Sequence, residues 1–415
     1  MVGQAYRASQ RISGIAVSPI LALSARARAL RAEGRDVIDL TVGEPDFDTP
    51  DAIKSAAKLA IDRGQTKYTP LTGSAELLSA IAWRMAARGH RVTQKQIIAS
   101  SGAKQVIHNA LDATLDPRSE VILPAPYWTS YADMIVLCGG RPVIAPGRVS
   151  AKRGWRIDPK AIAAAITSRT RWLLLNSPSN PTGSAMDDEE LAQVADVLRA
   201  HPHVWILCDD IYEDLIYAGE ARLPLPVLHP DLAERTLIVS GASKAYAMTG
   251  WRLGWGVGPA ELIAGMATVQ SQTTSAPCSI SQAAATAALT GSQDRVEAMV
   301  CAFRSRRDEL VGLLNAIPGI ECPSPDGAFY VFPRIEGLLG ARTPGGEVLK
   351  SDLDVAAYFL DVAGVATVPG SVFAGPGHLR FSFAAAPESL REACRRIAAA
   401  VLDLSQSPAH RPARA

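Results

Sequence analysis

The sequence predicts an α/β fold, with a large domain built on a mostly parallel sheet and a smaller α+β domain. The chain has 415 residues, which exceeds what one hydrophobic core usually serves. Hydrophobic residues make up 48% and charged residues 20%, a composition typical of a globular protein. Short aliphatic or β-branched runs alternate with Ala- and Leu-rich helical stretches, as in a parallel sheet covered by helices on both faces. The runs expected to be strands are residues 96–99, 120–123, 172–175, 204–208, 236–239 and 253–257.

A change in the residue pattern along the chain predicts where the two domains meet. We expect residues 46–291 to form the large domain, and residues 11–45 and 292–405 to form the small one. The second part of the small domain begins with a long charged helical stretch, residues 293–315, followed by Pro and Gly residues and new short strands. Residues 406–415 have the composition of a disordered tail.

Two further elements are expected near the N-terminus. Residues 18–33 have the pattern of an amphipathic helix, and residues 37–41 that of a strand leading into a Gly-Glu-Pro-Asp turn. Both belong to the segment that we assign to the small domain.

The balance of charge argues against some classes of partner. Forty-two Lys and Arg residues against forty-one Asp and Glu residues give a formal net charge of +1, so no global field would attract nucleic acid or an anionic membrane. No apolar run reaches the roughly 18 residues that a membrane helix needs. The first residues lack the apolar core of a secretory signal, and their Arg and Ser content is only weakly similar to a transit peptide. We therefore expect a soluble, cytoplasmic protein.

The six cysteines are far apart in the sequence, with no CxxC pair and no cluster of histidines beside them. This spacing predicts buried thiols in a reducing compartment. It indicates neither a disulfide framework nor a zinc site, so we expect no metal.

The first segment with a chemical signal is residues 240–258, SGASKAYAMTGWRLGWGVG. Lys244 follows a predicted strand among small residues, and Arg252 lies in an apolar, aromatic run. A lysine after a strand is usually solvated. Here, however, the small neighbours let a bulky ligand approach the backbone, and an unpaired charge in an apolar run is costly. An anionic ligand beside Lys244 would account for both features.

Polar side chains follow two other predicted strands. Asp209 and Asp210 come at the end of the run 204–208, and Tyr212 is spaced to return toward the same strand end. A buried aspartate can hold a proton on a cationic partner, although these carboxylates also suit a helix cap. Residues 176–183, NSPSNPTG, follow another strand, and a plain Asn-Pro turn is the alternative interpretation there.

Three more segments follow predicted strands or lie within one. Residues 99–105, ASSGAKQ, lead into a helix whose free N–H groups suit a phosphate, whereas no G-x-G-x-x-G supports a dinucleotide site. PYW at 126–128 supplies an aromatic plane, and Arg380 lies in the alternating run LRFSFA. Because open α/β sheets collect ligands at the carboxyl ends of their strands, these segments predict one central site.

Taken together, the segments resemble the fold-type I pyridoxal-phosphate enzymes, class I and II aminotransferases, and most of all the bacterial aspartate aminotransferases of the gamma subgroup. The resemblance runs from about Arg11 to Leu404. It implies the fold of pyridoxal-phosphate-dependent transferases, with a seven-stranded sheet, and a homodimer with shared active sites that acts on amino acids and 2-oxo acids. The motifs that carry it, in the order of the family, are LTVGEPDFDTP, KYTPLTG, SGAKQ, PYW, NSPSNPTG, CDDIYE, SKAYAMTGWRLGW, GAFYVF and LRFSFA.

The resemblance also implies roles around the cofactor, pyridoxal 5′-phosphate. Lys244 would form the Schiff base with the cofactor and then shuttle the substrate proton. Asp209 would pair with the pyridinium nitrogen, and Tyr212 and Asn180 would donate to the phenolate oxygen. Trp128 would stack on the face of the ring.

The cofactor phosphate has its own set of implied partners. They are the backbone of Gly102 and Ala103, Ser243, Arg252 and, from the neighbouring subunit, Tyr68. One departure from the family concerns Gly241, where many relatives carry a hydroxyl. Whether the adjacent Ser240 replaces it stays open.

For the substrate, the resemblance implies that Arg380 binds the α-carboxylate, assisted by Asn180 and the backbone at Gly43, with Trp128 beside it. Lys104 matches a lysine that meets the distal carboxylate of acidic substrates, although a solvent-facing lysine in a first helical turn is an equal alternative. The expected pair is therefore aspartate with 2-oxoglutarate, in a ping-pong reaction. Prephenate, aromatic and neutral amino acids stay open as alternatives.

Two other functions also stay open. A β-lyase on the same fold would use the same cofactor and would also bind an α-carboxylate. A non-catalytic ligand sensor is the alternative from another class. Such regulators usually carry an additional DNA-binding domain, for which a resemblance that starts near Arg11 leaves no room.

Overall fold

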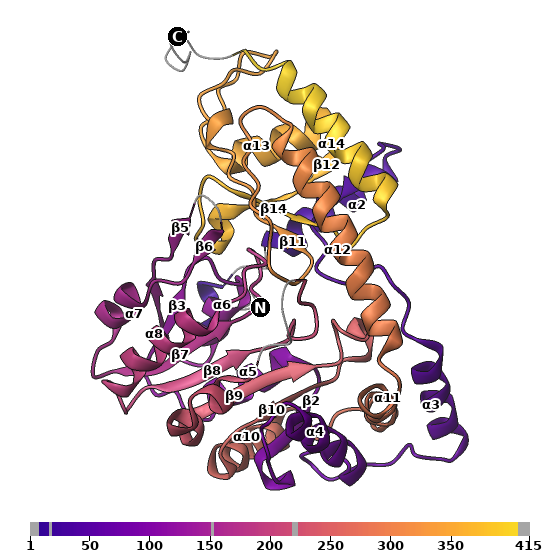
Figure 1. Ribbon diagram of the computed structural model, residues 1–415, viewed down its shortest axis with the longest axis vertical. Helices are drawn as coiled ribbons and strands as arrows, with labels where there is room; N and C mark the ends of the chain where they lie inside the picture. The colour runs from indigo at the N-terminus through magenta and orange to yellow at the C-terminus, as the bar shows by residue number, and fades with distance from the viewer. Residues whose placement is uncertain (1–7, 16–18, 151–152, 218–222, 406–415) are drawn as a thin grey trace, which may run out of the picture.

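The centre of the molecule is a seven-stranded sheet, seen in a computed structural model that describes residues 8–15, 19–150, 153–217 and 223–405 (Figure 1). The strand order is β2-β10-β9-β8-β7-β3-β4, and β10 runs antiparallel to both neighbours while the other pairs are parallel. This confirms the predicted fold class. The strands are β2 (Ile97–Ser100), β3 (Glu120–Pro124), β4 (Arg141–Ala145), β7 (Thr170–Asn176), β8 (Trp205–Asp209), β9 (Thr236–Gly241) and β10 (Gly254–Val257).

The sequence analysis missed β4, which lies at the edge of the sheet. Its residues are mostly exposed or half-buried and include Pro142, whereas β2, β8, β9 and β10 are buried almost throughout. Edge strands tolerate proline and polar residues because one side of their backbone has no sheet partner. A search for continuous apolar runs therefore finds the central strands and passes over this one.

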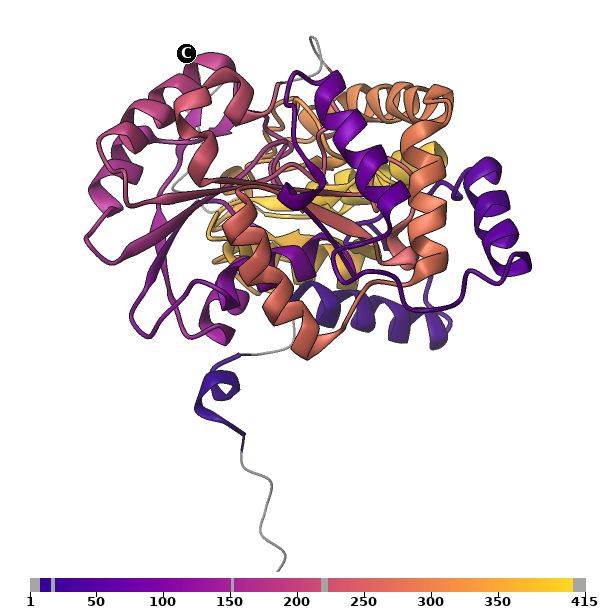
Figure 2. The ribbon, with the colours of Figure 1, turned by 90° about the horizontal axis from the view of Figure 1, so that it is seen from below.

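Helices cover both faces of the sheet (Figure 2). Neighbouring residues of a buried strand point to opposite faces and therefore pack into different cores. In β7, Trp172 and Leu174 belong to the core under α5, α6 and α10, whereas Leu173 and Leu175 belong to the core under α7 and α8. A third core joins the β2 and β10 side of the sheet to α4 and α11. The covering helices are α3 (Asp51–Asp62), α4 (Ala75–Ala87), α5 (Ala103–Asp112), α6 (Ser130–Leu137), α7 (Pro159–Ala165), α8 (Asp188–Arg199), α10 (Ala260–Thr273) and α11 (Ser279–Thr290).

The N-terminal elements α2 and β1 and those from α12 onward form a second packed group above the sheet in Figure 1, and the long helix α12 reaches from one group to the other. The domain boundaries at residues 46 and 291 stay a prediction, and the tail at 406–415 lies outside the described residues. The group contains α2 (Pro19–Ala32), β1 (Ile38–Asp39), α12 (Asp294–Asn315), β11 (Tyr330–Val331), α13 (Asp352–Tyr358), β12 (Val365–Ala366), β13 (Val368–Pro369), β14 (Leu379–Ser382) and α14 (Pro387–Leu402).

The expected N-terminal helix is present as α2, but the expected strand at 37–41 is shorter than predicted. Only β1 pairs in register, parallel to β12. The N–H of Thr41 bonds to the Asp39 side chain at 2.9 Å, so the backbone leaves the ladder there. The remaining short elements are α1 (Gln10–Ser13), β5 (Arg148–Ser150), β6 (Gly154–Arg156) and α9 (Leu225–Leu228).

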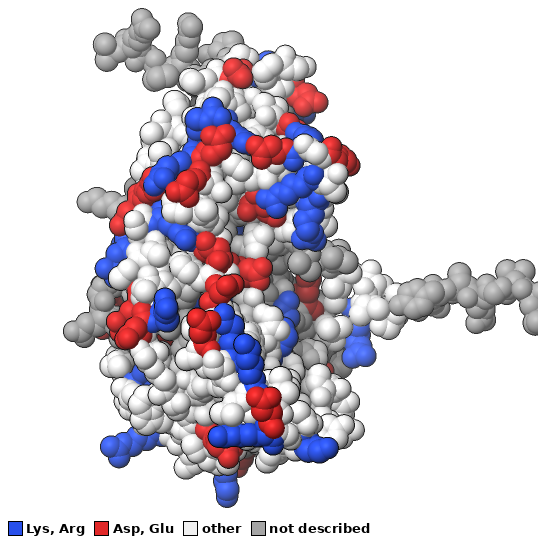
Figure 3. Space-filling view, turned by 90° about the vertical axis from the view of Figure 1, so that its right-hand side faces the viewer, with Lys and Arg blue, Asp and Glu red and all other residues white. Residues whose placement is uncertain are grey.

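Two global expectations can be compared with the structure. All six cysteines are free, but the expectation of buried thiols is wrong for Cys278 and Cys301, which lie exposed at helix surfaces. Within the described ranges, no helix has the length and apolar character to cross a membrane. On the face drawn in Figure 3, acidic and basic side chains are interspersed, so that face carries no large patch of one sign.

Candidate active site

A pocket of about 480 Å³ lies at the carboxyl ends of β7, β8 and β9, and residues of α2 and β14 also line it. The fold thus brings together segments that are far apart in the sequence. Tyr68 and Gly102 do not line this pocket. The expected site residues that do are Gly43, Ala103, Lys104, Trp128, Asn180, Asp209, Tyr212, Ser243, Lys244, Arg252 and Arg380.

Lys244 lies in the loop after β9, with its amine inside the protein. Its Nζ donates a hydrogen bond to the carbonyl oxygen of Gly43 at 2.6 Å. Burial lowers the pKa of this amine to about 8, against the opposing effect of Glu44 and with help from Arg252 and Arg380. A lower pKa increases the neutral fraction near neutral pH, and the neutral amine is the nucleophilic form.

Asp209 is the last residue of β8 and is only 3% exposed. Its Oδ2 accepts a hydrogen bond from the Tyr131 hydroxyl at 2.5 Å, and its Oδ1 accepts one from the N–H of Ile211 at 3.3 Å. Burial raises the pKa of Asp209 to about 6, because it outweighs these two bonds and the charge of Lys244. A buried carboxylate of this kind favours a cationic partner. Asp210 faces a different cavity.

Tyr131 was missed by the sequence analysis, although it follows Trp128 by less than one helical turn. It is buried, and its ring packs edge-on against Trp128 with 5.2 Å between the ring centroids. Burial, together with Asp209, raises the pKa of Tyr131 well above its usual value, so its hydroxyl stays a donor. The spacing of Tyr131 from Trp128 could have indicated a place at the site, but its hydrogen-bond partner Asp209 is 78 residues away in the sequence.

Arg380, in β14, is a buried cation without an acidic partner among the described residues, and it is 1% exposed. Its Nη1 donates to Oδ1 of Asn180 at 2.8 Å, and its Nη2 donates to the carbonyl of Thr41 at 2.6 Å. Its Nε has no hydrogen-bond partner in the described ranges. Burial lowers the pKa of this guanidinium. The arrangement suits an anionic ligand that enters the pocket.

Two tyrosines lie against this arginine. The hydroxyls of Tyr212 and Tyr330 are 2.9 Å apart, and the guanidinium of Arg380 is 4.6 Å from the centroid of the Tyr330 ring. Tyr330 was quoted within the motif GAFYVF but was not singled out as a site residue. Its place follows from the pairing of β11 with β14, which no local pattern shows.

The start of α5 forms a small cup beside Arg252. Gly102 has φ +95°, and a Cβ added there would lie 2.6 Å from Nη2 of Arg252. A Cβ at Gly254 would lie 2.2 Å from the backbone nitrogen of Ala103, so both glycines are needed for this approach. Free N–H groups at the start of a ten-residue helix, with a guanidinium and Ser243 nearby, are a donor set for phosphate.

Ser240 does not stand in for the hydroxyl missing at Gly241. It is buried, lies outside the pocket, and donates to Oε1 of Glu213 at 2.7 Å. Successive residues of a strand point to opposite faces, so Ser240 turns away from the side on which a residue at 241 points.

Lys104 is exposed in the first turn of α5, yet its amine bends over the pocket wall. Its Nζ donates to Oγ of Ser130 at 3.2 Å and lies 4.6 Å from the centroid of the Trp128 ring. Burial of the amine, together with Arg252, lowers the pKa of Lys104. Arg28 of α2 lines the same pocket. The lining therefore holds five lysine or arginine side chains against Glu44 and Asp209, which favours a ligand with several negative charges.

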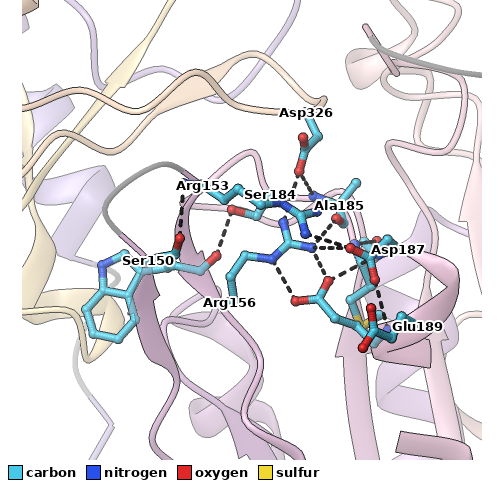
Figure 4. Close-up of polar contacts among 12 residues, drawn as sticks. Ser150, Arg153, Arg156, Ser184, Ala185, Asp187, Glu189 and Asp326 are labelled. Carbon is cyan, nitrogen blue, oxygen red and sulfur yellow. Dashed lines mark hydrogen bonds and ion pairs between the residues drawn. The ribbon is translucent and has the colours of Figure 1, made fainter. Parts of the chain in front are cut away.

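A buried ionic network supports the loop that carries Asn180 (Figure 4). Arg156 of β6 is 6% exposed, and its Nε donates to Oε1 of Glu190 at 2.7 Å. Its Nη1 donates to Asp326 at 3.1 Å, and its Nη2 donates to the carbonyl of Ala185 at 2.9 Å. These contacts tie the loop after β7 to α8 and to the segment that precedes β11.

Tyr68 is 95% exposed and borders a separate surface hollow with residues 276–280. Within one chain it therefore takes no part in the pocket. Its implied role needs a second subunit.

Comparisons with known proteins agree with this geometry. Residues 35–397 match the family described as aminotransferase class I and II. An aspartate aminotransferase of Rhizobium meliloti (strain 1021) is 50% identical, over 96% of this chain and 97% of its own length. An aspartate/prephenate aminotransferase of Cereibacter sphaeroides is 48% identical, over 96% and 99%.

Solved structures give the same result. The crystal structure of the aspartate aminotransferase from Rhizobium meliloti matches with a TM-score of 0.94 and 49% identity, covering 97% of this chain and 100% of that one. The aspartate aminotransferase from Thermus thermophilus with maleate matches with a TM-score of 0.87 and 39% identity, covering 95% and 100%.

Proposed function

The chain belongs to the class I and II aminotransferases and is a pyridoxal-phosphate-dependent aminotransferase, and from this premise we propose that it transfers the amino group of L-aspartate to 2-oxoglutarate by a ping-pong mechanism. One observation carries the choice of substrate. Arg380, which is buried and has no acidic partner among the described residues, and the cation Lys104 line the same pocket as Lys244. Two separate cations suit the two carboxylates of a dicarboxylic amino acid.

The pocket fits pyridoxal phosphate on two grounds. The cup at Gly102 leaves no room for a Cβ beside Arg252, which suits a phosphate approaching the backbone. The buried Asp209 has a raised pKa and suits a cationic ring nitrogen. We assign the phosphate to Gly102, Ala103, Ser243 and Arg252, the ring nitrogen to Asp209, the phenolate oxygen to Tyr212 and Asn180, and the ring face to Trp128.

Lys244 has two tasks in this proposal. Its neutral amine would hold the cofactor by condensing with its aldehyde carbon and releasing water, and the same Nζ, once free, would move the proton that leaves the substrate α-carbon. When bound, the cofactor supplies an electron sink that stabilises negative charge at that α-carbon. A pKa of about 8 suits this work, because the amine can both accept and donate a proton near neutral pH.

Arg380 orients the substrate for this transfer. Its guanidinium would fork onto the α-carboxylate, with Asn180 and the backbone at Gly43 beside it, and so fix the direction of the Cα–H bond. Burial of Arg380 keeps water away from this contact and strengthens it. Lys104 would bind the distal carboxylate near the mouth of the pocket.

We also propose that the enzyme works as a homodimer in which Tyr68 reaches the phosphate site of the second subunit. The exposed Tyr68 supports this proposal, because an aromatic side chain with so little cover in one chain suits a subunit contact. The cytoplasm stays the proposed location.

Prephenate is a second candidate substrate. The relative from Cereibacter sphaeroides is named an aspartate/prephenate aminotransferase, and prephenate also carries two carboxylates. The same two cations would serve both substrates.

The test is a half-reaction screen. Purified, cofactor-loaded enzyme is mixed with single amino acids, and the loss of the bound cofactor's visible absorbance is followed. Aspartate and glutamate should convert fastest. If aromatic or neutral amino acids convert faster, the acidic-substrate proposal is wrong, while release of pyruvate and ammonia from cystathionine without a 2-oxo acid would support a β-lyase instead.

A matched pair of variants tests Lys104. Lys104→Gln should lower kcat/KM for aspartate about 10-fold, the value of one charge-assisted contact near solvent, and leave alanine unchanged. Lys95→Gln removes an exposed lysine outside the pocket and should change neither substrate. Equal effects of Lys104→Gln on aspartate and alanine would show that it does not recognise the distal carboxylate.

A further inference from the structure

A cluster of His108, Asp112 and Cys138 lies apart from the lining of the active-site pocket. The candidate ligand atoms of the three side chains all lie within 4.8 Å of one another. His108 and Asp112 are four residues apart on α5, so they share one face of the helix, and Cys138 directly follows α6. The sequence analysis expected no metal because the six cysteines are far apart in the sequence, with no CxxC pair and no cluster of histidines beside them.

The contact geometry of this cluster suits one small metal ion. The Sγ of Cys138 and the Nδ1 of His108 are 3.3 Å apart. Ligand atoms about 2.0–2.3 Å from a tetrahedral zinc ion lie roughly 3.3–3.8 Å from one another, so this pair already has the required separation. Asp112 is the exposed member of the cluster, and a rotation of its side chain would close the remaining gap of about 1 Å.

Asp112 is also available as a ligand. Among the described residues its carboxylate makes neither an ion pair nor a hydrogen bond, and it is exposed. Cys138 is buried and His108 is half-buried, so two ligands are held by packing and the third is free to move. A site with two fixed ligands costs less ordering on binding than one formed by three free side chains.

We propose that His108, Asp112 and Cys138 bind one divalent cation of the zinc class, with water in the fourth position. Sulfur and imidazole ligands select zinc or cobalt over magnesium and calcium, which prefer oxygen ligands. The Cys138 thiol loses its proton to solvent when it binds the ion. Because α5 and α6 carry Lys104 and Tyr131 near their other ends, the ion would clamp together two helices that shape the active site.

Cobalt(II) is the probe that tests this proposal directly. Metal-free holoenzyme is titrated with Co²⁺, and difference spectra are recorded against the same holoenzyme so that cofactor absorbance cancels. We expect one equivalent per chain, with a thiolate-to-cobalt charge-transfer band and visible bands of four-coordinate cobalt. An equal concentration of Mg²⁺ or Ca²⁺ should not displace the ion, whereas Zn²⁺ should.

Three variants locate the site. Cys138→Ser should remove the charge-transfer band, and Asp112→Asn should weaken cobalt binding at least about 10-fold without disturbing the core, because Asp112 is exposed. Cys301→Ser removes an exposed thiol on α12 and should leave the titration unchanged. The proposal is overturned by a titration without a one-to-one endpoint, by a band that survives Cys138→Ser, or by equal affinity in wild type and Asp112→Asn.

Discussion

Replacing Tyr131 by phenylalanine should change how the enzyme binds its cofactor as a function of pH. The substitution keeps the buried ring and its contact with Trp128 but removes the hydrogen bond of 2.5 Å to Asp209. A hydrogen bond to a charged group is worth about 1.5–3 kcal/mol. Because this bond favours the ionised carboxylate, its loss should raise the pKa of Asp209 by about 1–2 from its value of about 6.

Cofactor binding to the apoenzyme reports this change. Only ionised Asp209 can pair with the ring nitrogen, so affinity should fall on the acid side of the Asp209 titration. The dissociation constant is measured across a pH series, and the midpoint of the acid limb should move upward by about 1–2 pH units in Tyr131→Phe. The cofactor's own titrations are the same for every variant and cancel in the comparison.

Tyr127→Phe is the matched control, because Tyr127 is adjacent to Trp128 and its hydroxyl makes no hydrogen bond to Asp209. Its acid limb should coincide with that of the wild type. If Tyr131→Phe and Tyr127→Phe have the same midpoint, Tyr131 does not tune Asp209 and the reasoning is refuted.

Three further changes test other parts of the site. Lys244→Ala should abolish the visible absorbance band of the Schiff base between Lys244 and the cofactor and lower transamination at least about 10³-fold, and an active variant that keeps this band would contradict the assigned role. In the apoprotein, Asp209→Asn should raise the urea midpoint at pH 8 but not at pH 4. Because burial raises the pKa of Asp209, the free energy of unfolding of the wild type falls by about 3 kcal/mol as pH rises from 3.8 through about 6. Equal urea midpoints of the wild type and Asp209→Asn at pH 8 would count against this. Arg156→Met should lower the free energy of urea unfolding by about 3–5 kcal/mol, because among the described residues it leaves the buried Glu190 with only Arg148, at 4.0 Å, as an ionic partner. Arg156→Met combined with Glu190→Met should recover most of that loss.

Local patterns were enough to predict the sheet and most of the pocket. A strand followed by small residues and one lysine is a signal contained within a few residues, and Lys244 lies in the pocket as expected. The same holds for Arg252, whose charge in an aromatic run called for a partner. Parallel strands bring their carboxyl ends to one edge, so the convergence of such segments could be predicted without knowing the strand order.

What could not be predicted depends on contacts between distant parts of the chain. Tyr131 and Asp209 are 78 residues apart, and Tyr212 and Tyr330 are 118 apart. Tyr212 was expected at the site, but Tyr131 and Tyr330 look like ordinary core in their own segments, and only the tertiary structure shows that their hydroxyls meet site residues. The direction of Ser240 was likewise undecided until the pairing of β9 with β10 fixed which face it occupies.

The pocket keeps two opposite charges buried without letting them neutralise each other. Within the part of the chain that the structure describes, Asp209 has only neutral hydrogen-bond donors, and Arg380 has only neutral acceptors and aromatic rings. A direct ion pair between an arginine and this aspartate would stabilise the empty protein, but it would also occupy the groups that a ligand has to find free. Leaving each charge partly compensated makes the folded apoprotein less stable, and binding returns that free energy because the ligand supplies the missing partners. The raised pKa of Asp209 reflects the cost of burying its ionised carboxylate. A ligand with a cationic ring nitrogen offsets that cost when it binds, so the cost becomes a source of affinity.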